Sequence, residues 1–199
     1  MHSAPISSLC VVSTLESDSD SVILATSSHD LSGRLTKFSP SSSESQPIAS
    51  LHLHEAPLSS ITASHTGTHL LTSSWDGLVG VWDTTIPTAD EVPLDQAEAN
   101  DRDRKKRRKI ADELERAIRK APATVLKGHT ARVSKAIFGA DQSQGAYSCG
   151  FDSTIRAWDV ENGFCTNTIV NNFPFVYLCF PLYYLTFDDI YRQHQKSHS

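Results

Sequence analysis

Several features that mark membrane, secreted or metal-binding proteins are missing from this sequence of 199 residues. The longest apolar stretch, residues 173–187, falls short of the roughly 20 residues of a membrane-spanning helix, and two prolines interrupt it. The N-terminus has no charged segment followed by an apolar one, so it does not resemble a secretory signal. The four cysteines show no CxxC pair and no metal-ligand spacing. We therefore expect no membrane contact, metal site or cofactor, and isolated thiols in a reducing compartment.

The charged residues are segregated along the chain. Residues 86–121 hold 10 of the 18 Lys and Arg residues and 9 of the 23 Asp and Glu residues. The remainder is mildly acidic, so its charge does not indicate nucleic acid as the partner of the folded part.

Three segments of the chain repeat one pattern. Each begins with His-x-Ala, at His2, His54 and His129, and continues with an aliphatic residue and a serine. A second block follows at residues 23–38, 70–83 and 146–159, and in the last two of these an Asp precedes a Trp by six residues. Repetition of one pattern along a chain indicates an array of similar structural units.

The periodicity within each unit is that of short antiparallel strands. Runs of Val, Ile, Leu and Thr are broken every 8–12 residues by Gly, Ser, Asp or Pro, and Asp76-Gly77 is a tight-turn signal. Four strands per unit form one propeller blade. The predicted fold is all-β, a partial β-propeller of about three blades at residues 1–50, 51–127 and 128–170. A charged insert (86–121) interrupts the second blade, and a non-repeat tail follows at 171–199.

The repeat units resemble the WD-repeat family. Gly128-His129 is similar to that family's Gly-His element, and Trp82-Asp83 and Trp158-Asp159 to its name-giving dipeptide. The first unit departs from the pattern, with Phe38 where Trp is expected. The resemblance implies that His, Ser or Thr, Asp and Trp form a hydrogen-bonded structural tetrad in each blade. The matching residues are His2, Thr26 and Asp30; His54, Thr72, Asp76 and Trp82; and His129, Ser148, Asp152 and Trp158.

The same residue types also suggest a hydrolase. Ser148, His129 and Asp152 are the side chains of nucleophilic hydrolysis. However, the set recurs in all three units, whereas an active site is needed once, and no GxSxG motif is present to expose a serine. We therefore predict a structural role for these residues and no enzyme activity.

The insert ends in an amphipathic pattern. Ile110, Leu114, Ala117 and Ile118 fall on one face of a helix, which Pro122 ends. The preceding run Lys105, Lys106, Arg107, Arg108 and Lys109 is a candidate nuclear-localisation signal. A solvated charged loop and an RNA contact are the alternatives.

The tail does not continue the repeat. Residues 171–199 hold eight of the sixteen aromatic residues and no His, Asp or Trp in phase. We interpret the tail either as a docking segment particular to this protein or as an aberrant end of the reading frame, and we favour the second interpretation.

The blades and the insert together resemble the WD repeat-containing protein 12 family, whose fungal members are the Ytm-type proteins. That resemblance implies a nuclear, nucleolar and nucleoplasmic scaffold that joins Pescadillo and Block-of-proliferation homologues in the PeBoW complex. Its role would be maturation of the large ribosomal subunit and rRNA processing on the pre-60S particle. We expect this chain to lack the family's ubiquitin-like domain and about four blades, so release by the ATPase midasin is not carried over.

Partner contacts are expected on the face that carries the turns between the second and third strands. The residue before each turn Asp should be exposed there: His29, Trp75 and Phe151. Exposed aromatic side chains are frequent anchors of protein interfaces. Packing of Trp75 on a neighbouring blade is the alternative. The competing functions are a ribosome-assembly scaffold, a generic nuclear WD-repeat adaptor, and a truncated product with no independent function.

Overall fold

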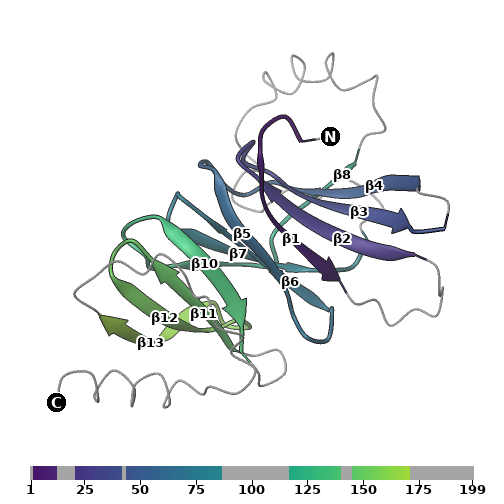
Figure 1. Cartoon of the computed structure of the whole chain (residues 1–199). Coiled ribbons are helices and arrows are strands. Elements are labelled where there is room, and N and C mark those ends of the chain that lie inside the picture. The colour runs from purple at the N-terminus through teal and green to yellow at the C-terminus, as the bar shows by residue number, and fades with distance from the viewer. Residues whose placement is uncertain (1, 13–20, 42–43, 87–116, 140–144, 171–199) are drawn as a thin grey trace, which may run out of the picture.

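The computed structural model describes residues 2–12, 21–41, 44–86, 117–139 and 145–170. These residues form three sheets that fan out from one another and are antiparallel except for one parallel pair in the first, with no helix among the described residues (Figure 1). The predicted all-β partial propeller is therefore confirmed. In each sheet the strands follow one another in chain order from the inner edge outward.

Each sheet is one blade with a short turn between most of its strands. Blade 1 consists of β1 (Ile6–Val12), β2 (Val22–Ser28), β3 (Gly33–Ser39) and β4 (Glu44–Leu51). Blade 2 consists of β5 (Leu58–Ala63), β6 (His69–Ser74), β7 (Leu78–Asp83) and β9 (Thr124–Lys127). Blade 3 consists of β10 (Val133–Phe138), β11 (Gly145–Gly150), β12 (Thr154–Asp159) and β13 (Phe164–Val170).

The turn between the second and third strands is built in the same way in every blade. Its third position has a positive φ, at Leu31, Gly77 and Ser153. The aspartate just before that position accepts a hydrogen bond from the backbone amide two residues after itself, as Asp76 does from Leu78 at 2.8 Å. This side-chain bond supports a left-handed conformation that is otherwise unfavourable for a residue other than glycine.

The insert interrupts the connection between β7 and β9, as the sequence predicts, but its end is not helical. Ile118–Lys120 forms strand β8, which pairs in parallel with β4 and becomes the fifth, outermost strand of blade 1. The helix prediction is therefore wrong at Ala117 and Ile118. The exposed edge of β4 offers unpaired backbone groups to any adjacent extended segment, and this pairing outweighs the local helical pattern. The rest of the predicted helical face lies outside the described residues.

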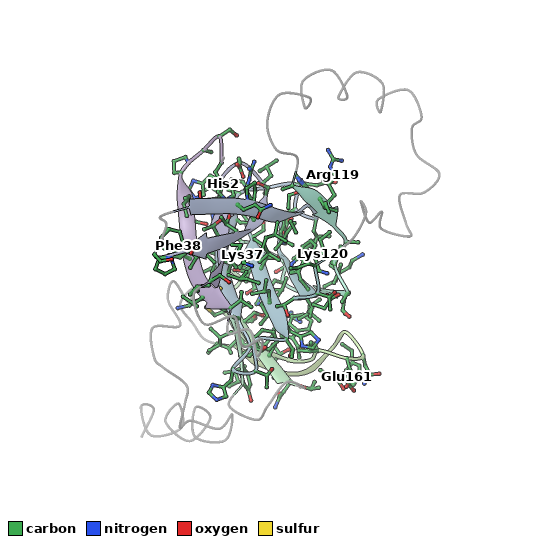
Figure 2. The ribbon with its side chains drawn as sticks, turned by 90° about the vertical axis from the view of Figure 1, so that its right-hand side faces the viewer. His2, Lys37, Phe38, Arg119, Lys120 and Glu161 are labelled. Carbon is green, nitrogen blue, oxygen red and sulfur yellow. The ribbon has the colours of Figure 1, made fainter. Side chains whose placement is uncertain are left out.

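Lys120, near the end of the charged insert, is buried although the insert is rich in charged residues. Its side chain points inward from β8 and the residue is 1% exposed, while Arg119 projects outward (Figure 2). The Nζ atom of Lys120 donates to Oδ1 of Asp83 at 2.7 Å and to the carbonyl oxygen of Thr85 at 2.8 Å. A buried ammonium needs such partners, because an unpaired one is costly to remove from water.

The apolar core lies between blades rather than within one blade. One cluster joins the outer face of blade 1, including Leu35 and Leu51, to Ile61, Leu70 and Trp82 of blade 2. A second cluster joins blade 2 to blade 3 in the same way, with Trp158 packed near Leu71 and Val79: its members are Leu71, Val79, Val81, Leu126, Val133, Ala136, Ala146, Trp158 and Val160. Blades 2 and 3 therefore each turn the face that carries the tryptophan toward the preceding blade.

The corresponding face of blade 1 is open. Leu58 of blade 2 and Val133 of blade 3 stand four residues after the repeat histidine, and both are buried, at 0% exposure. The equivalent residue in blade 1, Ile6, is 57% exposed, and Leu9 and Val11 further along β1 are exposed to the same degree. An inner strand that is buried in two blades is thus largely uncovered in the first.

Candidate protein-interaction face and its polar supports

The predicted tetrads of blades 2 and 3 come together as hydrogen-bonded chains. In blade 2, Trp82 Nε1 donates to Thr72 Oγ1 at 2.9 Å, and Thr72 Oγ1 lies 2.9 Å from His54 Nε2. His54 Nδ1 lies 2.9 Å from Oδ2 of Asp76. Since the hydroxyl accepts from the indole, its own hydrogen points to Nε2, and Nδ1–H donates to the carboxylate. The chain runs without a break from a buried indole to a surface turn.

Blade 3 repeats this geometry with shorter distances. Trp158 Nε1 donates to Ser148 Oγ at 2.7 Å, Ser148 Oγ lies 2.7 Å from His129 Nε2, and His129 Nδ1 lies 2.8 Å from Asp152 Oδ2. The hydroxyl of Thr154 donates a further hydrogen bond to the same carboxylate at 2.8 Å. Every polar atom of this largely buried chain has a partner, as buried networks require.

Blade 1 has the same chain without the indole. His2 Nδ1 lies 2.9 Å from Asp30 Oδ2, and His2 Nε2 lies 2.9 Å from Thr26 Oγ1. Phe38 has no donor to offer, so the chain ends at Thr26, whose hydroxyl is 3.5 Å from the carbonyl oxygen of Arg34. The first network is therefore one hydrogen bond shorter than the other two.

These contacts hold the turn aspartates in their ionised form. Burial by itself would raise the pKa of Asp30, but hydrogen bonds from Ser32, the Ser3 amide and His2 outweigh it and lower that pKa to about 2. The pKa values of Asp76 and Asp152 are also lowered, by hydrogen bonds from their histidines and from neighbouring donors of the turn. For His129, burial lowers the pKa more than Asp152 raises it, so the imidazole is neutral at physiological pH.

The serine of the apparent triad is buried and already hydrogen-bonded. Ser148 is completely buried, at 0% exposure, and its oxygen already accepts the indole hydrogen of Trp158. A serine nucleophile needs an open approach to its oxygen and oxyanion donors beside it. Neither the burial nor the hydrogen bonding of Ser148 provides that approach.

Above the tetrads, four side chains form what we call the aromatic strip: His29, Trp75, Arg132 and Phe151. The rings of His29 and Trp75 have centroids 5.4 Å apart and are tilted by 50°. The guanidinium carbon of Arg132 lies 4.5 Å from the centroid of the Trp75 ring. Trp75 is 38% exposed and Phe151 45%, and His29 and Arg132 are exposed as well. The strip therefore crosses all three blades on one face.

Two interpretations of Trp75, exposure as an interface anchor and packing on a neighbouring blade, each describe part of this geometry. Its ring packs against the neighbouring blades on both sides, through His29 and Arg132, yet more than a third of the residue remains accessible. The backbone beneath is fixed, because the Trp75 amide donates to the Pro57 carbonyl and the Phe151 amide to the Arg132 carbonyl.

Sequence reasoning missed Arg132. It stands three residues after His129, at the position occupied by Pro5 and Pro57 in the other repeats. A charged residue that replaces a proline at a repeated position was the signal that could have identified it.

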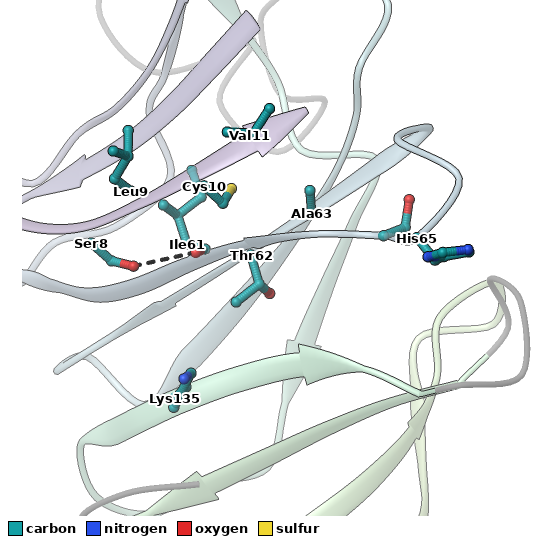
Figure 3. A pocket seen from close by; sticks show the side chains of 10 residues that line it. Ser8, Leu9, Cys10, Val11, Ile61, Thr62, Ala63, His65 and Lys135 are labelled. Carbon is teal, nitrogen blue, oxygen red and sulfur yellow. Dashed lines mark hydrogen bonds between the residues drawn. The ribbon is translucent and has the colours of Figure 1, made fainter. Parts of the chain in front are cut away.

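A shallow pocket of about 380 Å³ lies between the inner strands of the three blades. Ser8 and Cys10 from β1, Ile61 and His65 near β5, and Lys135 from β10 line it (Figure 3). The Ser8 hydroxyl donates to the Ile61 carbonyl at 3.4 Å. Burial raises the pKa of the Cys10 thiol to about 11, so this cysteine is a poor nucleophile at neutral pH.

Several sequence-based predictions fall outside the described residues, namely the basic run 105–109, most of the predicted insert helix and the tail 171–199. Within the described part of the chain, no cluster of three or more potential metal-ligating side chains is present. In the same residues, no helix is long and apolar enough to cross a membrane.

Comparison with known proteins agrees with the blade geometry. The family model "WD domain, G-beta repeat" matches residues 45–83 and 120–159. Ribosome biogenesis protein YTM1 from Laccaria bicolor is 53% identical over 175 residues, which is 84% of this chain and 38% of the relative. The protein of the same name from Coprinopsis cinerea is also 53% identical, over 85% of this chain and 39% of its own length.

A plant relative extends the similarity. Ribosome biogenesis protein WDR12 homolog from Arabidopsis thaliana is 31% identical over 81% of this chain and 36% of its own length. The chain thus spans less than two fifths of the length of these curated relatives. The repeat matches, the three blades and these similarities together identify the chain as a member of the WD-repeat family that is similar in sequence to the YTM1 and WDR12 proteins.

Proposed function

We propose that this chain is a non-catalytic protein-interaction scaffold in ribosome biogenesis, acting in large-subunit maturation and rRNA processing as a component of a PeBoW-type complex. The observation that carries the proposal is the 53% identity, over more than four fifths of this chain, to proteins named for ribosome biogenesis. The aromatic strip supplies a physical means of binding.

The strip has the properties of an interface anchor. Its aromatic side chains are partly exposed, and interface energy is concentrated in residues such as Trp, Tyr and Arg. Hydrogen bonds hold the backbone at Trp75 and Phe151 to neighbouring loops, and the tetrads tie the turns to the blades. Binding then costs little conformational entropy, because the surface is already ordered.

The proposed partners are homologues of Block-of-proliferation and Pescadillo on the pre-60S particle, and the proposed location is the nucleus, with the nucleolus and nucleoplasm. The basic run at residues 105–109 is the proposed import signal. Direct RNA contact through that run is a second use of the same charges.

Catalysis is the competing class of function, and the burial of Ser148 argues against it. A hydrolase built on His129, Ser148 and Asp152 would lose a measurable activity in Ser148→Ala while retaining its fold. We expect Ser148→Ala to lower thermal stability instead, because Trp158 and His129 lose their shared partner.

The test is co-sedimentation of the epitope-tagged full chain with pre-60S particles in gradients of a nuclear extract. Trp75→Ala should reduce the fraction that travels with the particles, whereas Lys127→Gln, an exposed residue of β9 outside the strip, should not. Recovery of the wild-type chain with other nuclear complexes would favour a generic adaptor. Recovery only in the unbound fractions would favour a chain with no independent function.

Nuclear import has its own readout. Replacement of the five cations at residues 105–109 by Ser should reduce nuclear accumulation of a fluorescent fusion without changing its melting temperature. Unchanged nuclear accumulation would refute the import signal and leave the scaffold proposal standing.

A further inference from the structure

We infer that the aromatic strip binds an acidic peptide segment of a partner protein, in which a carboxylate stands beside large apolar side chains. This inference rests on the proposed function, since it gives the chemistry of the partner at the same face. It begins from Arg132, the one cation in the strip.

Arg132 is held in a geometry that favours a carboxylate ligand. Its guanidinium lies over the Trp75 ring at 4.5 Å. A guanidinium that stacks through its flat face keeps its N–H groups directed outward along the edges. Those edges match the two oxygens of a carboxylate, and such paired hydrogen bonds are among the strongest that proteins form.

The part of the protein that the structure describes provides no counter-charge for this cation. Within the described ranges, no carboxylate oxygen lies within ion-pair distance of Arg132. The aspartate nearest in sequence to Phe151, Asp152, is engaged by His129, Thr154 and the Thr130 amide. The turn carboxylates are thus directed inward, and no carboxylate of the described residues compensates the positive charge of the strip.

The neighbours of Arg132 define the rest of the ligand. Trp75 lies on one side of it, and Phe151 is linked to it through the bond from the Phe151 amide to the Arg132 carbonyl. Both aromatic residues are more than a third exposed. Their apolar surface gains most from large apolar side chains of a partner, so a segment that alternates Asp or Glu with Phe, Leu or Trp fits the strip.

A nucleic acid is a poorer fit to the same surface. Aromatic rings can stack on bases, but affinity for single strands depends on several cations along the backbone. The strip contains one arginine. One cation over the ring of Trp75 suits a single carboxylate better than a row of phosphates.

The test begins with selection of random peptides displayed on phage against the full chain, without prior assumption about the ligand. Enrichment of Asp or Glu next to Phe, Trp or Leu is expected. Selected sequences, made as fluorescent peptides, should bind at least about tenfold more weakly to Arg132→Gln and to Trp75→Ala, as for loss of an interface anchor. Lys127→Gln serves as the matched control and should bind within about twofold of wild type, because loss of a solvated charge outside an interface changes little.

Two further measurements separate the effect of the positive charge of Arg132 from that of its paired hydrogen bonds. Affinity of wild type should fall with added salt, and that dependence should nearly vanish in Arg132→Gln. Arg132→Lys should give an intermediate affinity, because an ammonium keeps the charge but loses the paired hydrogen bonds. Melting curves of all variants verify the fold.

Three outcomes would overturn the inference: selection of basic or uncharged peptides, no enrichment of any peptide, or equal binding by wild type and Arg132→Gln. Tighter binding of oligo-uridine than of any peptide, lost in Arg132→Gln, would assign the strip to RNA instead. If Trp75→Ala still removes the chain from pre-60S particles in any of these cases, the proposed function survives and only the partner chemistry is wrong.

Discussion

The Nζ atom of Lys120 lies 2.7 Å from Oδ1 of Asp83, which joins the end of the insert to the last residue of β7. Thr85 accepts from the same ammonium through its carbonyl oxygen. Because β8 also pairs with β4, this segment links the outer edges of blades 1 and 2. Both ends of the insert are therefore held close together at the outer edges of these two blades.

Two deletions that differ only in residues 117–120, which contain β8, should have different effects. Replacement of residues 88–116 by a short Gly/Ser linker should leave the melting temperature nearly unchanged, because loop-closure entropy varies slowly with length. Replacement of 88–120 should cost about 1–3 kcal/mol, because Asp83 and the Thr85 carbonyl lose their donor. Urea unfolding monitored by far-UV circular dichroism measures both.

Lys120→Met isolates the ammonium from the strand. It should reproduce part of the loss caused by the longer deletion while it keeps the β4–β8 pairing. Identical unfolding curves for the two deletions would mean that β8 contributes no stability.

The turn aspartates should differ in their contribution to stability. Asp152→Ala removes the acceptor of His129, Thr154 and the Thr130 amide, and we expect it to cost about 1–3 kcal/mol. Asp30→Ala should cost less, because the network in blade 1 ends at Thr26 without an indole. Equal shifts of the melting temperature for the two variants would count against the network interpretation.

The free energy of unfolding should fall in two steps on acidification. The folded-state pKa of His129 lies below 6.5, so the unfolded chain takes up that proton first and stability declines as pH drops below about 6.5. In the folded state the pKa of Asp30 is lowered to about 2, and the pKa values of the two other turn aspartates lie below 3.8. Their contribution is present above about pH 3.8 and is lost as the pH falls from there toward 2.

Urea titrations at a series of pH values between 8 and 2 test this. Asp30→Asn should weaken the second step and leave the first unchanged. A stability that stays constant from pH 6.5 down to 2 would refute the assignment of these groups.

The open face of blade 1 should cause self-association. Ile6, Leu9 and Val11 are each more than half exposed, although the equivalent residues of blades 2 and 3 are mostly buried. Apolar surface of this kind favours contact between molecules. Light scattering of the isolated chain should show oligomers at micromolar concentration.

The triple variant Ile6→Thr, Leu9→Thr, Val11→Thr should reduce the scattering. The control is Thr166→Ser and Thr168→Ser on β13, which leaves the apolar surface of β1 intact. A monodisperse wild-type chain that melts cooperatively would overturn this prediction.

The sequence by itself determined the blades, because their signals are local. Strand periodicity, the Asp76-Gly77 turn and the spacing from Asp152 to Trp158 each lie within one unit, and repetition made each signal visible again. The grouping of His129, Ser148 and Asp152 could be proposed for the same reason, since all three occupy repeated positions.

Only the tertiary structure decided the positions of Ile118, Lys120 and Arg132. Ile118 fits a helical pattern, yet it pairs with Ala49, far away in sequence, because the edge of β4 was open. Lys120 in a charged insert looks solvated, but Asp83 and Thr85 provide a buried site for its ammonium. Arg132 acquires its meaning from Trp75 of the adjacent blade. Such contacts depend on which surfaces meet after the blades have formed, and no local pattern of residues contains that information.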